Sequence, residues 1–387
     1  MIDYDSLLSQ KVKALKPSGI RKFFDIANEM EDVISLSIGE PDFATPWHIR
    51  QEGIATLEAG KTWYSPNAGF NELREEIVKF YNNKYNVLYD KQEVIVTIGG
   101  SEAIDACIRA TVETGDEVLI PEPCFVCYDP ITRLAGGTPV PIKTKSEDLF
   151  RLKANDLKKH ITSKTKLLIL PFPSNPTGAV LRKEDLEEIA DVLKDTNILV
   201  LSDEIYSELT YGEPHVSFAS VKGMQERTVV VNGFSKSYAM TGWRLGYAMG
   251  PKKIIEMMTK IHQYAIMSSP TTSQYAAIDA LKNGDADIAY MREQYNLRRR
   301  LLVDGFTKMG LECFEPQGAF YVFPSIKSTG LSSDEFCNML LKKQHVAVIP
   351  GTAFGECGEG FIRVSYSYSI KHLVEALERI KIFIGGL

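Results

Sequence analysis

The sequence predicts an α/β fold in two parts, a large domain with a mostly parallel sheet between helices and a smaller α+β domain. Short apolar segments alternate with amphipathic segments through the middle of the chain, which is typical of repeated βαβ units. Beyond about residue 285 this alternation gives way to one long charged segment and a few short apolar ones. The 387 residues are enough for two domains with a sizeable core.

The large domain is expected over residues 46–285. Its segment 183–194 has apolar residues at helical spacing, and so predicts one of the helices that cover the sheet. Parallel sheets of this kind bind ligands beyond the carboxyl ends of their strands. The segments expected to form strands are 94–98, 117–120, 166–170, 198–201 and 228–231.

The smaller domain is expected over residues 286–387, together with an N-terminal arm of residues 1–45. A long helix is expected over 286–309, followed by short strands over 319–323, 346–349 and 361–364. Ser332 and Ser333 precede two acidic residues and then the apolar segment 336–341. Serine caps and early acidic residues favour a helix N-terminus, so a helix is expected to begin there.

The composition is that of an ordinary globular protein, with 44% hydrophobic and 24% charged residues. A net charge of -6 argues against a surface for nucleic acid or anionic lipid. No apolar segment approaches the roughly 20 residues that span a membrane. The acidic start has no apolar stretch typical of a signal peptide, so a cytoplasmic enzyme is expected.

The six cysteines are scattered, unlike those of a disulfide scaffold. Cys124 and Cys127 form a C-x-x-C pair, but the chain lacks a thioredoxin-like context and a second pair of zinc ligands. We therefore expect this pair to be structural and expect no metal site.

Three apolar strands are each followed by polar residues with distinct chemistry. These are Asn175, then Asp203 with Tyr206, then Lys236. Each step along the chain is about 30 residues, the length of one βαβ crossover. These side chains are therefore expected to converge at one edge of one sheet.

Lys236 is the most informative of them. A lysine among other cations and partly removed from water can lose its proton near neutral pH and attack a carbonyl carbon. Ser235 and Arg244 lie nearby in the sequence and can both hold a phosphate. Together they point to pyridoxal phosphate. On its own, a lysine at a strand end is more often an exposed loop residue, and it is the other residues of the pattern that favour the cofactor.

The other residues fit roles around the same cofactor. Asp203 can keep a pyridine nitrogen protonated, although a helix N-cap is the alternative for this residue. Asn175 and Tyr206 can donate to the ring phenolate oxygen. Once released, Lys236 can move the substrate's α-proton as general base and acid.

A site for the phosphate is expected where the strand 94–98 leads into a helix. Gly99 and Gly100 let the backbone approach an anion, and the helix N-terminus at Ser101 and Glu102 offers free N–H groups. This turn is neither GxGxxG nor GxxxxGK, so dinucleotide and P-loop sites are disfavoured. Arg244 adds positive charge.

Phe125 follows the next strand along the chain. Its ring could stack on the cofactor, or it could be a core aromatic residue.

These motifs resemble those of the class I/II aminotransferases, the fold-type I pyridoxal phosphate enzymes, along nearly the whole chain. The resemblance implies a sheet of the seven-stranded type and an N-terminal region that closes on substrate. It favours the branch that acts on aspartate, aromatic amino acids or N-acetyl-diaminopimelate. The matching stretches are SIGEPDFATP (37–46), YSPNAGFNELRE (64–75), GGSEA (99–103), PSNPTG (173–178), SDEIYSELTY (202–211), SKSYAMTGWRLGY (235–247) and FIRVSYS (361–367).

The resemblance also implies roles for residues outside the three strand ends. Arg363 matches the arginine that pairs with the substrate α-carboxylate, a task that suits a bidentate guanidinium. Gly39 matches a backbone contact to the same carboxylate, and Asn175 is expected to contact substrate there too. Tyr64 matches a tyrosine that reaches the phosphate in the neighbouring subunit, which implies a homodimer with shared active sites.

Within the arm, Ile20 is expected to cover the ring and Arg21 to meet a distal substrate carboxylate. The alternative for Arg21 is an exposed arginine at a helix start.

One position departs from the pattern of the family. Some relatives have serine or threonine where this chain has Gly233, which makes Ser235 the nearer hydroxyl to the phosphate.

Two other functions are alternatives for this sequence. A carbon–sulfur β-lyase would use the same lysine and cofactor, although the MTGWR segment favours transamination. A transcriptional regulator on this fold would need an added DNA-binding domain, and the match begins too early in the chain to leave room for one.

Overall fold

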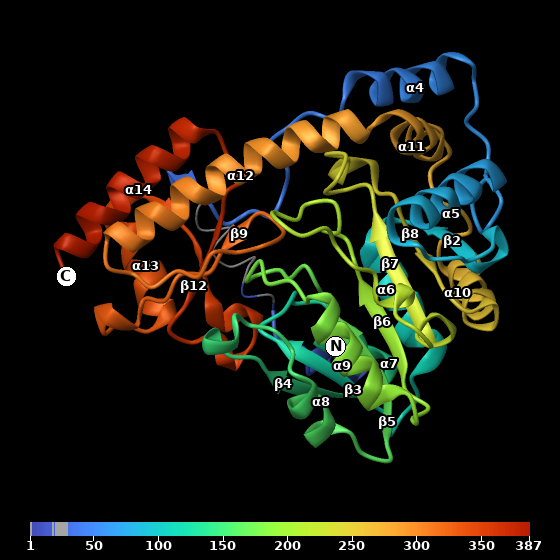
Figure 1. The fold of residues 1–387 in the computed structure, drawn as a ribbon, viewed down its shortest axis with the longest axis horizontal. Helices are drawn as coiled ribbons and strands as arrows, with labels where there is room; N and C mark the ends of the chain where they lie inside the picture. Colours follow the sequence, from blue (N-terminus) through green and yellow to red (C-terminus); the bar gives the residue numbers. More distant parts are fainter. Residues whose placement is uncertain (1, 18, 20–29) are drawn as a thin grey trace.

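The computed structural model describes residues 2–17, 19 and 30–387. Its centre is a seven-stranded sheet in which β8 is antiparallel to both of its neighbours and all other pairs are parallel (Figure 1). In spatial order the strands are β2 (Val94–Thr97), β8 (Gly246–Met249), β7 (Thr228–Gly233), β6 (Leu199–Asp203), β5 (Thr165–Leu170), β3 (Glu117–Glu122) and β4 (Thr138–Lys143).

The central strands are continuous apolar segments because helices cover both of their faces. Alternate residues of β7 show this, since Val229 and Val231 pack toward α6 and α10 whereas Val230 packs toward α5 and α11. The helices around this sheet are α4 (Trp47–Glu58), α5 (Asn71–Tyr85), α6 (Gly99–Thr111), α7 (Tyr128–Ala135), α8 (Ala154–His160), α9 (Lys183–Leu193), α10 (Lys252–Ala265) and α11 (Thr271–Asn283).

The C-terminal part of the chain, together with β1 from the N-terminal part, forms two small sheets with three α-helices (Figure 1). One sheet is antiparallel, in the order β11 (Ile349–Pro350), β12 (Ile362–Ser365), β9 (Tyr321–Val322). The other pairs β1 (Ile34–Ser35) in parallel with β10 (Val346–Ala347). The helices are α12 (Asp285–Lys308), α13 (Ser333–Gln344) and α14 (Ile370–Gly385).

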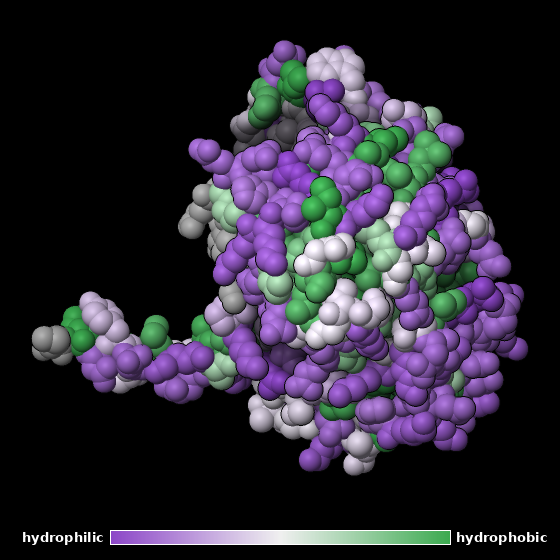
Figure 2. Space-filling view, turned by 90° about the vertical axis from the view of Figure 1, so that its left-hand side faces the viewer, coloured by the Kyte–Doolittle hydropathy of each residue, from purple (hydrophilic) through white to green (hydrophobic). Residues whose placement is uncertain are grey.

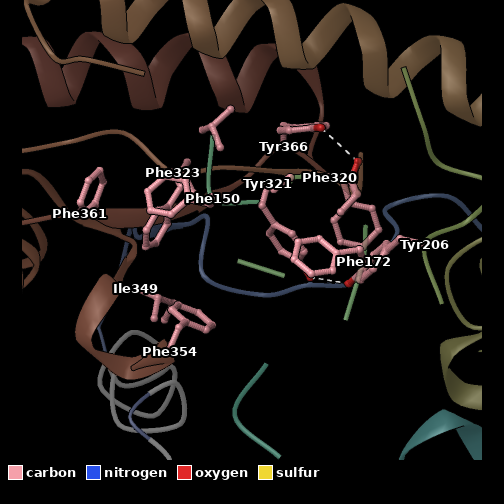
Figure 3. Packing of buried hydrophobic residues seen from close by; sticks show 14 of the residues in the cluster. Phe150, Phe172, Tyr206, Phe320, Tyr321, Phe323, Ile349, Phe354, Phe361 and Tyr366 are labelled. Carbon is pink, nitrogen blue, oxygen red and sulfur yellow. Dashed lines mark hydrogen bonds between the residues drawn. The ribbon is translucent and has the colours of Figure 1, made fainter. Parts of the chain in front are cut away.

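One apolar cluster joins the two regions. It contains Tyr206, which follows β6, and Phe320 and Tyr321 at the start of β9. Figure 3 shows these rings side by side, with the Tyr206 ring centroid 5.3 Å from that of Phe320 and 5.9 Å from that of Tyr321. The three-stranded sheet is therefore packed directly against the edge where β6 ends.

The N-terminal segment lies apart from this core. It contains the short helices α1 (Tyr4–Leu7) and α2 (Gln10–Lys13) and projects from the body of the molecule (Figure 2). Its apolar side chains are exposed: Ile2, Tyr4, Leu7, Leu8 and Val12.

The predicted fold class is confirmed, with a mostly parallel seven-stranded sheet between helices. The sequence prediction omitted β1, β4 and β8, and it joined β10 and β11 into one strand. The domain boundaries at residues 46 and 285 stay a prediction. Within the described parts of the chain, no helix combines the length and apolarity that crossing a membrane requires.

Candidate active site

A cavity of about 650 Å³ opens at the carboxyl ends of β5, β6 and β7. The start of α6 and residues of β9 and β12 complete its walls. Most of the predicted site residues line it together, although they are scattered from residue 39 to residue 363. They are Gly39, Gly100, Ser101, Phe125, Asn175, Asp203, Tyr206, Ser235, Lys236, Arg244 and Arg363.

Lys236 follows β7, and its Nζ donates a hydrogen bond to the Gly39 carbonyl oxygen over 2.7 Å. Burial lowers the pKa of its ammonium to about 8; the nearby Glu40 carboxylate opposes this change, and the guanidinium groups of Arg363 and Arg244 add to it. With this pKa, about a tenth of Lys236 is a neutral amine at pH 7, far more than for an ordinary lysine, and the neutral amine is the form that a nucleophile or base requires.

Asp203 is the last residue of β6 and is buried. Its Oδ2 accepts a hydrogen bond from the Tyr128 hydroxyl over 2.7 Å, and its Oδ1 accepts one from the Ile205 N–H over 3.2 Å. Burial raises the pKa of Asp203 to about 6, although these hydrogen bonds and the Lys236 ammonium oppose the shift. The contact of Asp203 with the Ile205 N–H resembles that of a helix N-cap, but Asp203 also lines the cavity.

Arg363 lies in the middle strand of the three-stranded sheet and is almost completely buried. Its Nη1 donates to Asn175 Oδ1 over 2.9 Å, and its Nη2 donates to the Ser37 carbonyl oxygen. Among the described residues, its buried Nε has no hydrogen-bond partner. Burial lowers the pKa of this guanidinium, so its positive charge favours an anionic ligand.

Two tyrosines missing from the sequence prediction take part in the site. Tyr321 lines the cavity, and its hydroxyl lies 2.8 Å from that of Tyr206. A Cβ at Gly39 would lie 2.0 Å from the Tyr321 hydroxyl oxygen, so only glycine fits there. Tyr128 contacts Asp203 from the start of α7. Tyr321 falls within a predicted strand, but no periodic signal distinguishes it from a core residue.

The start of α6 lies beside Arg244. Gly99 has a φ of +73°, and a Cβ there would lie 2.8 Å from the Arg244 guanidinium. The N-cap residue Ile98 makes no side-chain cap, so the first N–H groups of the helix have no side-chain acceptor at that position. Gly100 and Ser101 line the cavity at this point.

Glu102 is placed differently from its neighbours in the turn. Its carboxylate accepts from the Ile98 N–H over 2.5 Å and lies 2.6 Å from His262 Nδ1, and the residue does not line the cavity. The Glu102 side chain is thus turned away from the cavity, and the predicted phosphate contact of Glu102 stays a prediction.

One other predicted residue that the structure describes, Tyr64, does not line the cavity. Tyr64 is 78% exposed, so the described residues of its own chain leave most of its side chain uncovered. Ile20 and Arg21 lie outside the described residues.

The cysteines make no disulfides, and burial raises the pKa of the Cys124 thiol well above its usual range. Across residues 2–17, 19 and 30–387, no group of His, Cys, Asp or Glu side chains is arranged to hold a metal ion. The predicted structural role of Cys124 and Cys127 stays a prediction.

The family model "Aminotransferase class I and II" matches residues 31–380. The chain belongs to the class I and II aminotransferases. This finding confirms the resemblance inferred from the sequence motifs and the expectation of a transferase.

Individual relatives agree over nearly the full length. A putative aminotransferase YugH of Bacillus subtilis is 52% identical over 98% of both chains. An aspartate aminotransferase of Pyrococcus abyssi is 47% identical over 97% of both. The crystal structure of an aromatic aminotransferase from Pyrococcus horikoshii superposes with a TM-score of 0.90 at 46% identity, covering 94% of this chain and 99% of that one.

Proposed function

We propose that this aminotransferase binds pyridoxal 5'-phosphate in the cavity at the ends of β5–β7 and moves an amino group from an L-amino acid to a 2-oxo acid. The observation that carries the proposal is the meeting of three groups in one cavity. These are the Lys236 amine with a pKa near 8, the buried Asp203 carboxylate and the Arg363 guanidinium. When bound, the cofactor supplies an aldehyde carbon and an electron-withdrawing ring.

The residues of the cavity fit the cofactor's phosphate end. The first N–H groups of α6 and the Arg244 guanidinium provide positive potential, and Gly99 leaves room for Arg244 where a side chain would meet it. The buried Ser235, together with Gly100 and Ser101, also lines the cavity.

The ring end fits as well. Asp203 is positioned by Tyr128 so that its carboxylate can hold a proton on the ring nitrogen. Asn175, Tyr206 and Phe125 also line the cavity. Asn175 and Tyr206 would donate to the ring oxygen of the cofactor, and Phe125 would stack on its ring.

The substrate end depends on Arg363 and Lys236. The buried guanidinium binds the substrate α-carboxylate, which satisfies the free Nε hydrogen and compensates the buried charge. With the carboxylate held, the Cα–H bond is brought toward Lys236, whose neutral amine removes the proton and returns it as an ammonium. The Gly39 carbonyl oxygen orients Nζ through the 2.7 Å hydrogen bond.

We further propose that the enzyme is a homodimer in which Tyr64 reaches the partner subunit's phosphate site. The exposed position of Tyr64 and the neighbouring exposed Trp63 support this proposal, since large apolar patches mark interaction surfaces. Mixing chains of inactive Lys236→Ala with chains of inactive Tyr64→Ala should restore one good site in each mixed dimer. No recovery of activity after verified subunit exchange would contradict shared sites.

The substrate is proposed to be of the aspartate, aromatic or N-acetyl-diaminopimelate type, because relatives bearing these names match nearly the full chain. For a dicarboxylic donor, Arg21 is the proposed partner of the distal carboxylate. Arg21→Ala should then raise KM for aspartate or glutamate by roughly one to two orders of magnitude and leave aromatic donors nearly unchanged. Equal losses for both donor types would contradict this role for Arg21.

The experiment that tests the function is a panel of amino acids added to purified enzyme with bound pyridoxal phosphate. The visible absorbance should convert to that of the pyridoxamine form with the true donor, and added 2-oxo acid should reverse the change. Release of pyruvate from a cysteine conjugate, without an acceptor and at a higher rate, would instead identify a carbon–sulfur β-lyase.

A further inference from the structure

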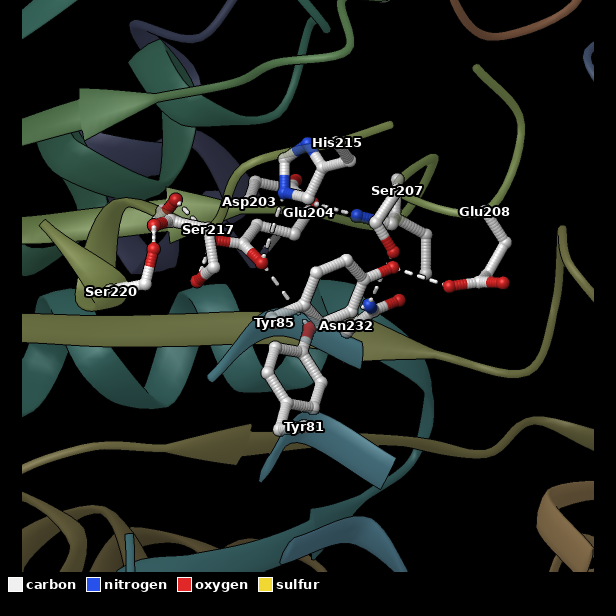
Figure 4. A network of polar contacts seen from close by, with 12 residues as sticks. Tyr81, Tyr85, Asp203, Glu204, Ser207, Glu208, His215, Ser217, Ser220 and Asn232 are labelled. Atoms are coloured by element: carbon white, nitrogen blue, oxygen red, sulfur yellow. Dashed lines mark hydrogen bonds and ion pairs between the residues drawn. The ribbon is translucent and has the colours of Figure 1, made fainter. Parts of the chain in front are cut away.

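A second polar cluster adjoins the cavity, next to Asp203. Glu204 follows Asp203 directly, and its side chain is fully buried. Its Oε1 accepts hydrogen bonds from Ser202 Oγ over 2.9 Å and from Ser217 Oγ over 2.8 Å (Figure 4). His215 Nε2 lies 3.2 Å from the other oxygen, Oε2. Since a buried carboxylate is costly unless it is well paired, this arrangement calls for a function.

Glu204 is joined to the end of β7 by two routes. Its backbone N–H donates to the Val231 carbonyl oxygen over 2.8 Å and so extends the β6–β7 ladder. Its Oε2 accepts from the Tyr81 hydroxyl over 3.4 Å, and that hydroxyl accepts from Asn232 Nδ2 over 2.7 Å. Asn232 Oδ1 in turn accepts from the Gly233 N–H over 2.7 Å.

These two strand ends carry the groups that must meet on the cofactor. Asp203 ends β6, and Lys236 follows Gly233 at the end of β7. Asp203 takes other partners, Tyr128 and Ile205, so the two adjacent carboxylates are held by separate sets of donors.

We propose that Glu204 is a positioning residue for the cofactor site: through Tyr81 and Asn232 it holds the end of β6 against the end of β7, and so sets Asp203 relative to Lys236. The proposal rests on the proposed function, since it assigns Glu204 a part in holding pyridoxal phosphate. It does not place Glu204 in contact with cofactor or substrate.

The chain contains a matched control in Glu208. This carboxylate is also buried, with 8% exposure, and belongs to the same neighbourhood (Figure 4). Its partners are the Lys84 ammonium at 2.8 Å and the Tyr85 hydroxyl. The same ammonium also forms an ion pair with the exposed Asp285. Glu208 therefore belongs to the side of the cluster that leads to the surface.

The test compares Glu204→Gln with Glu208→Gln in the full chain, using pyridoxal 5'-phosphate as the probe. Glutamine keeps the shape of Glu204 but replaces one acceptor oxygen with an NH2 group, which would face hydrogen-bond donors. We expect Glu204→Gln to raise the Kd for pyridoxal phosphate roughly tenfold, to weaken the visible circular dichroism of the bound cofactor, and to lower kcat more than it changes KM. Glu208→Gln should lower the melting temperature and leave the Kd and the dichroism within about twofold.

A second variant covers the case in which Glu204→Gln does not fold. Tyr81→Phe removes only the hydroxyl that links Glu204 to Asn232, and it should shift the Kd and the dichroism in the same direction by a smaller factor. If the foldable variants among Glu204→Gln and Tyr81→Phe match Glu208→Gln in Kd and dichroism, Glu204 has only a structural role and the proposal is overturned. A parent protein that binds no pyridoxal phosphate would instead overturn the proposed function.

Discussion

The seven-stranded sheet and the three-stranded sheet both contribute to one cavity, but they position their residues by different means. In the large sheet, Asn175, Asp203 and Lys236 follow three adjacent parallel strands, so chain order alone brings them to one edge. In the small sheet, Arg363 and Tyr321 lie on short antiparallel strands of four and two residues. These strands reach the cavity only because an aromatic cluster packs them against the end of β6.

The two regions also differ in the chemistry that they contribute. The large sheet provides the amine and the carboxylate whose pKa values lie near 8 and 6, which are suited to bond making and proton transfer. The small sheet provides the Arg363 guanidinium, which is suited to binding and orientation. Reaction and substrate binding are thus divided between the two, and substitutions in each region should give different kinetic signatures.

The largest effect is expected for Lys236→Ala. Without the amine there is neither a nucleophile nor a base for the α-proton, so transamination should fall by at least about four orders of magnitude. Some pyridoxal phosphate should still bind, because the phosphate contacts remain. Single-turnover absorbance with the best donor measures the rate. A variant that keeps even a tenth of the parent rate would contradict the role of Lys236.

Asp203→Asn should come next. Asparagine keeps the shape but cannot stabilise a protonated ring nitrogen, so kcat should fall roughly 100-fold or more. Tyr128 can still bond to the amide oxygen, and the melting temperature should therefore change little. Normal activity with unchanged melting would show that Asp203 serves only as a cap.

Arg363→Lys tests the small sheet. A lysine keeps the charge but loses the planar fork, so kcat/KM should fall roughly 10- to 100-fold, mostly through a higher KM. Steady-state kinetics are measured with the natural amino acid and with the amine that lacks its carboxylate. The comparison separates lost carboxylate binding from other effects of the substitution. The amine should be affected much less, and an equal loss for both compounds would rule out α-carboxylate binding by Arg363.

The smallest effect concerns the contact between the two regions. Glu122 ends β3 and lies against Gly355 in the loop between β11 and β12. Burial, with repulsion from Asp129 and Glu356, raises the pKa of Glu122 to about 7, although Lys143 opposes the shift. The folded protein therefore holds this proton more tightly than the unfolded chain does. The stabilisation of the folded state by protonated Glu122 is complete below the ordinary carboxyl pKa of 4.5 and is lost as the pH rises to about 7.

Glu122→Gln should remove this pH dependence, because glutamine cannot ionise. The variant and the parent should melt alike near pH 4.5. At pH 8 the variant should be more stable by about 1 kcal/mol, a value reduced from the full shift because the carboxyl group is partly exposed. Thermal unfolding across this range measures the difference. A constant difference at all pH values would show that Glu122 does not titrate in this window.

The inner parallel strands β3, β5, β6 and β7 were predictable because each is a continuous apolar segment. An α-helix follows β3 and β5, but the chain between β6 and β7 forms only short 3₁₀ helices where the spacing of Asp203 and Lys236 predicted a helical crossover. Helix α9 was predicted to within one residue, and the predicted strands for β5, β6 and β7 overlap the observed ones. The edge strand β4 was missed because its burial is incomplete and it contains two prolines. The strand β8 was missed because it begins with glycine, has only four residues and follows Lys236 without an intervening α-helix.

The sequence by itself determined the order of reactive residues along the sheet edge, since buried parallel strands allow only one register and one direction for their ends. Its motifs also pointed to Arg363 and Gly39, although no periodicity places them near Lys236. Only the tertiary structure decided that Tyr128 would hold Asp203, that Tyr321 would leave room for nothing larger than glycine at position 39, and that Glu102 would turn toward His262. Those contacts join residues far apart in the chain, and they depend on how side chains fill space between elements, which local hydrophobic patterns do not encode.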